Sequence, residues 1–194
     1  MKKLFIGAAL SLVATCAVHA ADGASPFRFV LGGGLTLGGD TLTSVPFTDG
    51  STRSVKAGSI FAIYGGAEYR LGTAVSLQAT VGYQVDDATG SNGSVRFSRY
   101  PVDLLAYYHV NDQFRLGGGA QLVNSARLST SGAGSAFAAN TSYDSTTGVV
   151  IEGEYLFNPK MGFKVRAVSE KFKQTGTNNS VSGNHLGLLF NYYL

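Results

Sequence analysis

Charged side chains of opposite sign stand at alternate positions on both sides of a short Asn-Pro-Lys segment at residues 158–160. Glu152 and Glu154 precede this segment, and Lys164 and Arg166 follow it. Counted outward from a tight turn there, Glu154 and Lys164 lie at comparable heights, as do Glu152 and Arg166. A buried charge must be paired, since removing one partner of a buried pair costs about 3–5 kcal/mol. The spacing therefore predicts the ion pairs Glu154–Lys164 and Glu152–Arg166.

A second group of residues surrounds His185. Ser180 and Ser182 lie just before it, and Glu170 lies on the preceding predicted strand. A Ser–His–Glu set can perform nucleophilic catalysis, because the histidine activates the serine hydroxyl as a base. The alternative, which we favour, is a histidine near the end of a strand that forms a hydrogen bond to a loop. The sequence predicts no catalytic residue, no metal site and no cofactor.

The elements that carry these residues are predicted strands. Residues 75–86 alternate without exception: Val75, Leu77, Ala79, Val81, Tyr83 and Val85 form one face, and six non-apolar residues form the other. Strict period-two alternation indicates a strand with one apolar face. The same rhythm recurs often enough to predict eight strands, at 27–37, 61–71, 75–86, 96–110, 114–122, 149–157, 161–167 and 184–194.

The connections between these strands alternate in length. Those at 72–74, 111–113 and 158–160 are tight turns, whereas those at 39–58, 87–94, 127–146 and 174–183 are long and rich in Ser, Thr, Gly and Asn. Long and short connections in alternation are typical of an up-and-down barrel that spans a membrane. We predict an all-β fold, an eight-stranded antiparallel up-and-down transmembrane β-barrel.

The composition agrees with export to a membrane. Residues 1–20 combine a basic start, an apolar run at 4–18 and the pattern Val18-x-Ala20, which predicts a cleaved secretory signal peptide followed by a barrel domain at 21–194. The only cysteine, Cys16, lies within that signal. Without Lys2 and Lys3 the net charge falls from +3 to +1, which gives no indication of nucleic-acid binding. Charged residues make up 14%, against about a quarter in soluble domains.

Two solvents are possible for the apolar faces. A soluble lipocalin-like barrel would turn them inward, and a membrane barrel would turn them toward lipid. The predicted strands reach about ten residues, the length that crosses hydrocarbon at a tilt. We therefore place the apolar faces outside and the charged faces inside. The predicted interior ion-pair network comprises Arg28, Glu68, Arg70, Asp103, Arg115, Glu152, Glu154, Lys164 and Arg166.

The C-terminal strand carries the family resemblance. Its outward row is Leu186, Leu188, Phe190, Tyr192 and Leu194. This row resembles the assembly signal of Gram-negative outer-membrane proteins, and the whole mature chain resembles the small eight-stranded barrels of the OmpA and OmpX type. It departs from the usual pattern in ending on Leu194 instead of phenylalanine and in lacking tryptophan. The resemblance implies an integral protein of the bacterial outer membrane, a monomer, whose partners are membrane lipid and the barrel-assembly machinery.

Three functions follow from this resemblance. The one we favour is a non-enzymatic role in envelope integrity or surface interaction, with the interior plugged by ion pairs instead of serving as a gated ion path. The second is a narrow channel for small hydrophobic molecules, similar to OmpW-type barrels. The third is a lipid A-modifying enzyme; the deacylase type has a His-x-Ser pair, but Gly187 stands where that pattern needs serine.

A set of basic residues at predicted outer strand ends could contact lipopolysaccharide. Charge-assisted hydrogen bonds from lysine and arginine to phosphate are among the stronger ones that proteins form. The predicted contact residues are Arg96, Arg99, Lys171 and Lys173.

Overall fold

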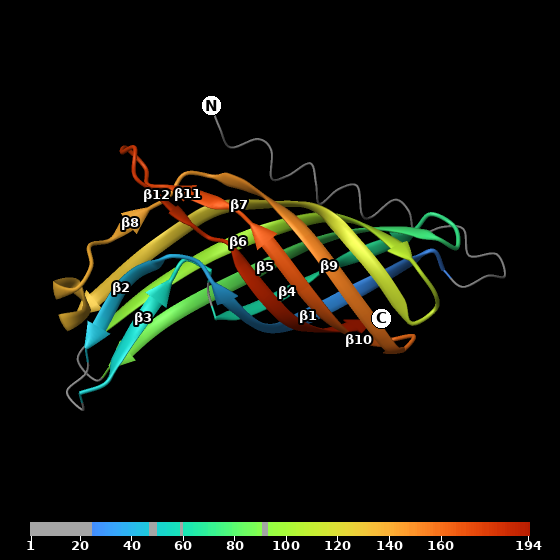
Figure 1. Cartoon of the computed structure of the whole chain (residues 1–194), viewed down its shortest axis with the longest axis horizontal. Coiled ribbons are helices and arrows are strands. Elements are labelled where there is room, and N and C mark those ends of the chain that lie inside the picture. The colour runs from blue at the N-terminus through green and yellow to red at the C-terminus, as the bar shows by residue number, and fades with distance from the viewer. Residues whose placement is uncertain (1–24, 47–49, 59, 91–92) are drawn as a thin grey trace.

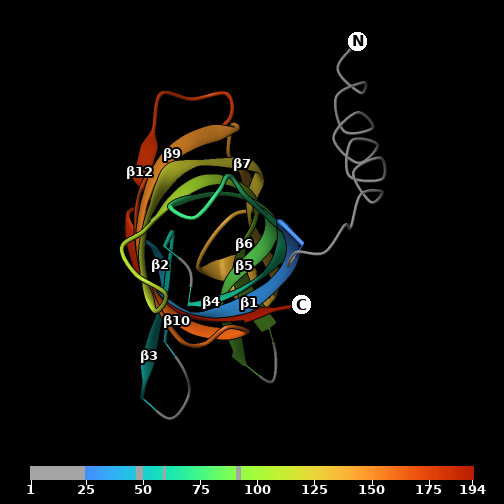
Figure 2. The same ribbon diagram turned by 90° about the vertical axis from the view of Figure 1, so that its right-hand side faces the viewer.

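The computed structural model describes residues 25–46, 50–58, 60–90 and 93–194, and the predicted signal peptide lies outside these ranges. Eight long strands form one antiparallel sheet in the order β6-β5-β4-β1-β13-β10-β9-β7, and pairing of β6 with β7 closes it into a barrel (Figures 1 and 2). The predicted fold class is therefore confirmed. The strands are β1 (Phe27–Gly38), β4 (Phe61–Arg70), β5 (Val75–Gly90), β6 (Gly93–His109), β7 (Phe114–Gly132), β9 (Thr146–Asn158), β10 (Met161–Ser169) and β13 (His185–Tyr193).

The alternation in the sequence becomes an alternation between the outer wall and the lumen. On β10, Phe163 and Val165 are exposed on the outer wall, whereas Lys164 and Arg166 between them are buried inside. Leu77, Val81 and Leu188 are likewise exposed, as a lipid-facing row requires. We call the zone of the barrel with this apolar outer wall the belt. None of the described residues belongs to a helix long and apolar enough to cross a membrane.

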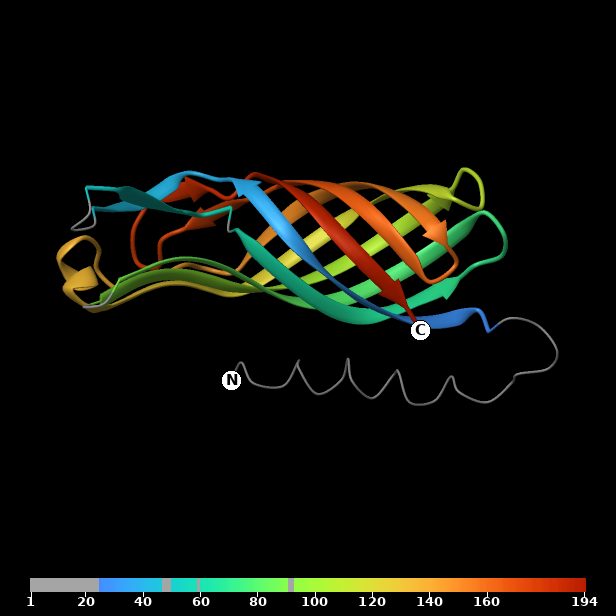
Figure 3. The ribbon, with the colours of Figure 1, turned by 90° about the horizontal axis from the view of Figure 1, so that it is seen from below.

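One end of the barrel is formed by short turns, and the first and last strands meet there. The backbone N–H of Leu194 donates to the carbonyl of Phe29 at 3.0 Å, and that of Tyr193 donates to the carbonyl of Lys160 at 2.7 Å. The turns after β4, β6 and β9 lie at this same end (Figure 3).

The other end is far more ordered than the sequence predicted. Much of the predicted long loops is strand: β5, β6 and β7 continue well beyond the belt, and two hairpins stand beside them (Figure 3). We call this end the head. It comprises the distal parts of β5–β7 together with β2 (Thr41–Pro46), β3 (Thr52–Lys56), the 3-10 helix η1 (Ala133–Ala136), β8 (Thr141–Ser142), β11 (Lys171–Lys173) and β12 (Ser180–Ser182).

The interior of the head is mostly apolar. The rings of Phe97, Tyr143 and Phe172 pack edge to face, with centroids 5.8–6.2 Å apart. The buried residues around them complete what we call the head cluster: Val45, Val55, Ala57, Ala88, Val95, Val123, Ala126 and Leu128. Most of these residues lie in or next to predicted loops, because small and hydroxyl residues hide the alternation there.

Candidate functional site

The belt encloses a network of ion pairs, most of them fully buried. Near the short-turn end, the guanidinium of Arg115 lies 2.7 Å from Glu68 Oε2 and 2.7 Å from Glu154 Oε2. Arg28 adds a second cation to Glu68, with Nη2 2.7 Å from Oε1. Since Glu68 is on β4 and Arg115 on β7, which are not neighbours in the sheet, this contact crosses the lumen.

A second group of ion pairs lies deeper in the belt. Lys164 Nζ is 2.8 Å from Glu152 Oε2, and Arg166 Nη1 is 2.7 Å from Asp103 Oδ2. Arg166 also pairs with Glu152 through Nε, so the predicted Glu152–Arg166 pair is present. The predicted Glu154–Lys164 pair is wrong. The two residues do stand opposite one another in the β9–β10 register. However, Lys164 forms its ion pair with Glu152, and Glu154 forms its ion pair with Arg115.

Polar side chains that the sequence analysis did not single out complete this network. Tyr107 donates its hydroxyl to Glu152 and accepts a hydrogen bond from Lys164 Nζ at 2.7 Å. Tyr193 donates to Glu154 at 2.7 Å, and Asn191 donates to the same carboxylate at 2.8 Å. Gln78 donates to Glu68 at 3.0 Å. The phase of the alternation identifies all of them as inward-facing, and that was the signal available for finding them.

Two arginines lie elsewhere than predicted. Arg70, predicted inside, is exposed at the end of β4 next to a short turn, and it forms no ion pair within the described part of the chain. Arg70 has the phase of an inward residue, but it is the last residue of β4 and therefore lies at the open rim of the barrel. Arg99, predicted to contact lipopolysaccharide from the outer rim, is fully buried. Because β6 begins already at Gly93, Arg99 lies well inside a continuous strand and points into the lumen.

Arg99 belongs to a smaller group between the belt network and the head, which we call the upper cluster. Arg99 Nη1 pairs with Glu170 across the lumen, and His185 Nδ1 lies 3.5 Å from the same carboxylate oxygen. Three buried atoms of this cluster have no hydrogen-bond partner among the residues that the structure describes: Arg99 Nε, Glu170 Oε2 and His185 Nε2. Buried polar groups that lack a protein partner are the usual binding places of internal water.

The charges of the lumen are balanced. Five cations and five carboxylates form ion pairs there among the described residues, and their sum is zero. They are Arg28, Arg99, Arg115, Lys164 and Arg166 against Glu68, Asp103, Glu152, Glu154 and Glu170.

The geometry around His185 does not assemble the Ser–His–Glu set. His185 and Glu170 are close, but His185 Nδ1 contacts the carbonyl of Gly183 at 2.8 Å. No hydrogen bond joins His185 to Ser180 or Ser182 within the part of the chain that the structure describes. No group of three or more His, Cys, Asp or Glu side chains among the described residues could hold a metal ion.

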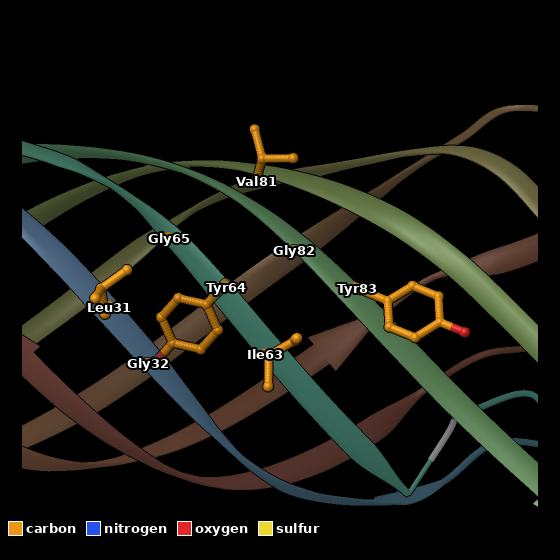
Figure 4. A pocket seen from close by; sticks show the side chains of 8 residues that line it. All are labelled: Leu31, Gly32, Ile63, Tyr64, Gly65, Val81, Gly82 and Tyr83. Atoms are coloured by element: carbon orange, nitrogen blue, oxygen red, sulfur yellow. The ribbon is translucent and has the colours of Figure 1, made fainter.

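The outer wall carries a shallow depression of about 470 Å³ over β1, β4 and β5 (Figure 4). Leu31, Ile63, Val81 and Tyr83 flank it, and glycines form much of its floor. In Figure 4 the ring of Tyr64 lies beside Gly32, where any larger residue would collide with that ring. Tyr64 also donates to Asn191 inside the lumen, so its ring closes the floor of the depression.

The remaining predicted residues lie on the outside. Arg96, Lys171 and Lys173 are exposed on the head, and Arg96 pairs with Asp87 at 3.2 Å. On β13, Leu186 and Leu188 are exposed, as is Leu194 just beyond it. Phe190 packs against Phe163, with ring centroids 5.6 Å apart, and Tyr192 is half-buried in the same outward row.

Comparison with known proteins identifies the class. Residues 8–193 match the model of the outer membrane protein beta-barrel domain. The chain therefore belongs to this family of outer-membrane barrels.

Solved structures of small outer-membrane barrels resemble it. Ail, the attachment invasion locus protein of Yersinia pestis, shares 15% identity over 87% of this chain and 97% of its own, with a TM-score of 0.52. Neisserial surface protein A shares 13% over 88% and 99%, with a TM-score of 0.51. OprG from Pseudomonas aeruginosa shares 13% over 89% and 98%, with a TM-score of 0.46. At these identities the likeness extends to the fold alone. No curated protein sequence matched significantly.

Proposed function

We propose that this protein is a closed, non-enzymatic barrel of the bacterial outer membrane that supports envelope integrity or surface interaction through its head. The observation that carries the proposal is a double barrier along the barrel axis. The ten charges of the lumen are paired with one another, and the apolar head cluster follows them. An ion path through the barrel would have to separate buried pairs and then cross an apolar layer, and both steps are costly.

Conductance in planar bilayers tests this proposal. We expect the purified barrel to give no stable current steps, while a general porin inserted under the same conditions gives them. As an opened control, the quadruple substitution Asp103→Ala, Glu152→Ala, Lys164→Ala and Arg166→Ala removes two carboxylates and two cations that pair with one another. It is combined with Phe172→Ser in the head cluster. Stable current steps from the unaltered protein would overturn the proposal.

The depression in the outer wall favours a second candidate, a lateral route for small hydrophobic molecules. The proposal of a closed barrel predicts that uptake of a hydrophobic dye by whole cells does not depend on the protein. Gly65→Leu would fill the depression, since an added Cβ there meets the flexible end of the Leu31 side chain at 3.1 Å and the carbonyl of Val30 only at an ordinary contact distance of 3.7 Å. Gly153→Leu is the matched control on another part of the wall, with no atom closer than 3.8 Å. Protein-dependent uptake that Gly65→Leu alone abolishes would establish the lateral route instead.

The absence of enzymatic activity is part of the proposal and has its own test. We expect the mass spectrum of lipid A to be the same with and without the gene. A change in lipid A that depends on the gene and disappears in a His185→Ala variant would show that the protein is an enzyme.

The outer charges and the chain ends complete the proposal. Arg96, Lys171 and Lys173 contact lipopolysaccharide phosphates. The barrel-assembly machinery binds the outward row of β13. The protein acts as a monomer. Residues 1–20 are removed as a signal peptide. N-terminal sequencing of the protein from outer membranes is expected to begin at Ala21.

A further inference from the structure

The outer face of the head carries a polar groove of about 300 Å³ between β7 and β8. The two strands pair over only two positions, Arg127 with Ser142 and Leu128 with Thr141. Beyond these positions the chain leaves β7 through η1 and returns to β8, so the two segments are not joined by a ladder. Every residue that lines the groove is polar: Arg127, Ser129, Thr130, Asn140, Thr141 and Ser142.

The groove offers hydrogen-bonding groups that the protein itself does not use. Arg127 forms no ion pair within the described part of the chain, in contrast to Arg96 and Arg53, which lie near Asp87 and Asp86. The hydroxyls of Ser129 and Ser142 form no hydrogen bond there either. Asn140 is fixed by its oxygen, which accepts from the backbone N–H of Thr130 at 2.7 Å, so its amide nitrogen remains a donor.

The surroundings of the groove are basic. The N–H of Asp144, two residues after Ser142, donates to the carbonyl of Lys173 at 2.9 Å, which places exposed Lys171 and Lys173 on the adjacent outer face. The nearby carboxylate of Asp144 accepts a hydrogen bond from the Thr175 hydroxyl at 2.8 Å. No carboxylate lines the groove itself.

The position of the groove indicates the direction from which a ligand comes. Leu122 on β7 is exposed in the belt, and Arg127 follows it by five residues on the same strand. Because β7 is irregular at Ser125, Leu122 pairs with Val102 and Arg127 with Ser98, four residues apart on β6. At about 3.3 Å per residue, Arg127 lies roughly 13 Å further along the wall. The groove therefore opens sideways just beyond the belt, at the level of lipid headgroup saccharides, and not at the tip of the head.

We propose that this groove binds a phosphorylated saccharide, the inner core of lipopolysaccharide in the same membrane. The inference rests on the proposed surface role of the head and gives it a ligand. Arg127 donates to a phosphate group, since a guanidinium with free donors matches phosphate geometry. The hydroxyls and the Asn140 amide bind sugar hydroxyls.

The test uses the whole barrel in phospholipid nanodiscs and the purified inner-core oligosaccharide with its phosphates, measured by titration calorimetry. We expect Arg127→Gln to weaken binding about tenfold or more, because hydrogen bonds between charged groups are the stronger ones. Chemical removal of the phosphates should weaken binding to the unaltered protein by a similar factor and leave the affinity of Arg127→Gln unchanged.

Two controls separate this site from charge in general. Arg70→Gln removes an exposed, unpaired arginine at the opposite end of the barrel and is expected to leave affinity unchanged. The second control is titration with a sulfated glucosamine polymer. If the protein binds this polymer more tightly than the core oligosaccharide, the ligand is not the lipopolysaccharide of its own membrane. Equal affinity of Arg127→Gln and the unaltered protein, or equal losses in Arg127→Gln and Arg70→Gln, would overturn the site.

The binding test and the conductance test fail independently. A conducting barrel that still binds the oligosaccharide through Arg127 would refute the closed lumen and keep the site. A barrel that gives no current steps and does not bind the oligosaccharide would keep the closed lumen and refute the site.

Discussion

The lumen within the belt and the interior of the head share strands β5–β7, but inward-facing residues are mainly charged or polar in the belt and mainly apolar in the head. On β6, Asp103 and Tyr107 face the charged lumen, whereas Phe97 faces the head cluster from the same side of the strand. On β7, Arg115 lies in the lumen and Leu128 in the head cluster. On β6 the inward phase is kept throughout, and only the chemistry of the inward residues changes. On β7 the phase shifts by one residue at Ser125, so the buried positions are Val123 before it and Ala126 and Leu128 after it.

The difference lies in what each outer wall touches. In the belt the wall meets lipid, so burying apolar side chains inside gains little, and polar residues can occupy the lumen when they are paired. Around the head the wall meets water, and the hydrophobic effect again favours an apolar interior. The upper cluster of Arg99, Glu170 and His185 lies at the boundary between the two regions.

The largest expected effect concerns the belt network. Arg115→Met leaves Glu68 and Glu154 buried without their shared cation, and we expect the free energy of unfolding to fall by about 3–5 kcal/mol. Urea unfolding in lipid vesicles measures this; circular dichroism is the suitable signal because the chain has no tryptophan. Arg70→Met, at an exposed and unpaired position, is the matched control. Similar small losses in both variants would show that the network does not stabilise the barrel.

A cavity in the head is expected to have a more local effect. Phe172 is fully buried among aromatic rings, and truncation of such a residue costs about 3 kcal/mol. For Phe172→Ala we expect hydrogen exchange to accelerate in β2, β3, β11 and β12 while the strands within the belt stay protected. Faster exchange throughout the barrel would mean that the head and belt unfold as one unit.

The outer walls can be compared directly by adding the same charge to each. Leu188→Arg places an arginine against lipid, and we expect a loss of about 2–4 kcal/mol near the middle of the bilayer. Thr52→Arg places one on the water-exposed wall of the head, where surface substitutions stay within about 0.5 kcal/mol. Urea unfolding of both variants in vesicles measures the difference. Equal losses would contradict the assignment of the two solvents.

The smallest expected effect is a pH dependence of the head. Asp86 Oδ2 accepts a hydrogen bond from the backbone N–H of Lys56 at 2.7 Å, and Asp86 Oδ1 lies 3.8 Å from Arg53 Nη2. Burial disfavours its charged form and raises the pKa of this carboxyl above its ordinary value. The folded head therefore holds this proton more tightly than the unfolded chain does. The contribution of Asp86 to the stability of the head is therefore greatest below about pH 4 and decreases as the pH rises through the raised pKa.

Hydrogen exchange in the β2–β3 hairpin measures this dependence. We expect protection to decrease with rising pH, after correction for the intrinsic exchange rate, and Asp86→Asn to flatten the profile. The same profile in both proteins would exclude Asp86 as its cause.

The strand pattern was predictable because alternation depends on neighbours in the chain alone. Lys164 and Arg166 were correctly placed inside by their phase. Arg99 shares the phase of Asp103 within the predicted strand 96–110, so the alternation alone also places it inside. The order of the head was hidden, because Ser- and Thr-rich alternation with small inward residues has the composition of a loop.

Partners across the lumen could not be predicted in the same way. Glu68 meets Arg115 and Asp103 meets Arg166, each between strands that are not neighbours in the sheet. Arg99 on β6 likewise meets Glu170, which directly follows β10. Such contacts depend on the closure and stagger of the whole barrel, which fix the height of each strand relative to those opposite. The groove beside Arg127 depends in addition on the path of the chain from η1 back to β8.

The sequence by itself determined the number of long strands, the side of each strand that faces lipid and the set of charges available to fill the inside, because a two-residue period assigns each side chain to one face. The tertiary structure decided which charges pair, where the charged lumen gives way to an apolar interior and which arginine stays free on the surface. Those outcomes require closure of the barrel, since only closure brings distant strands within reach of one another.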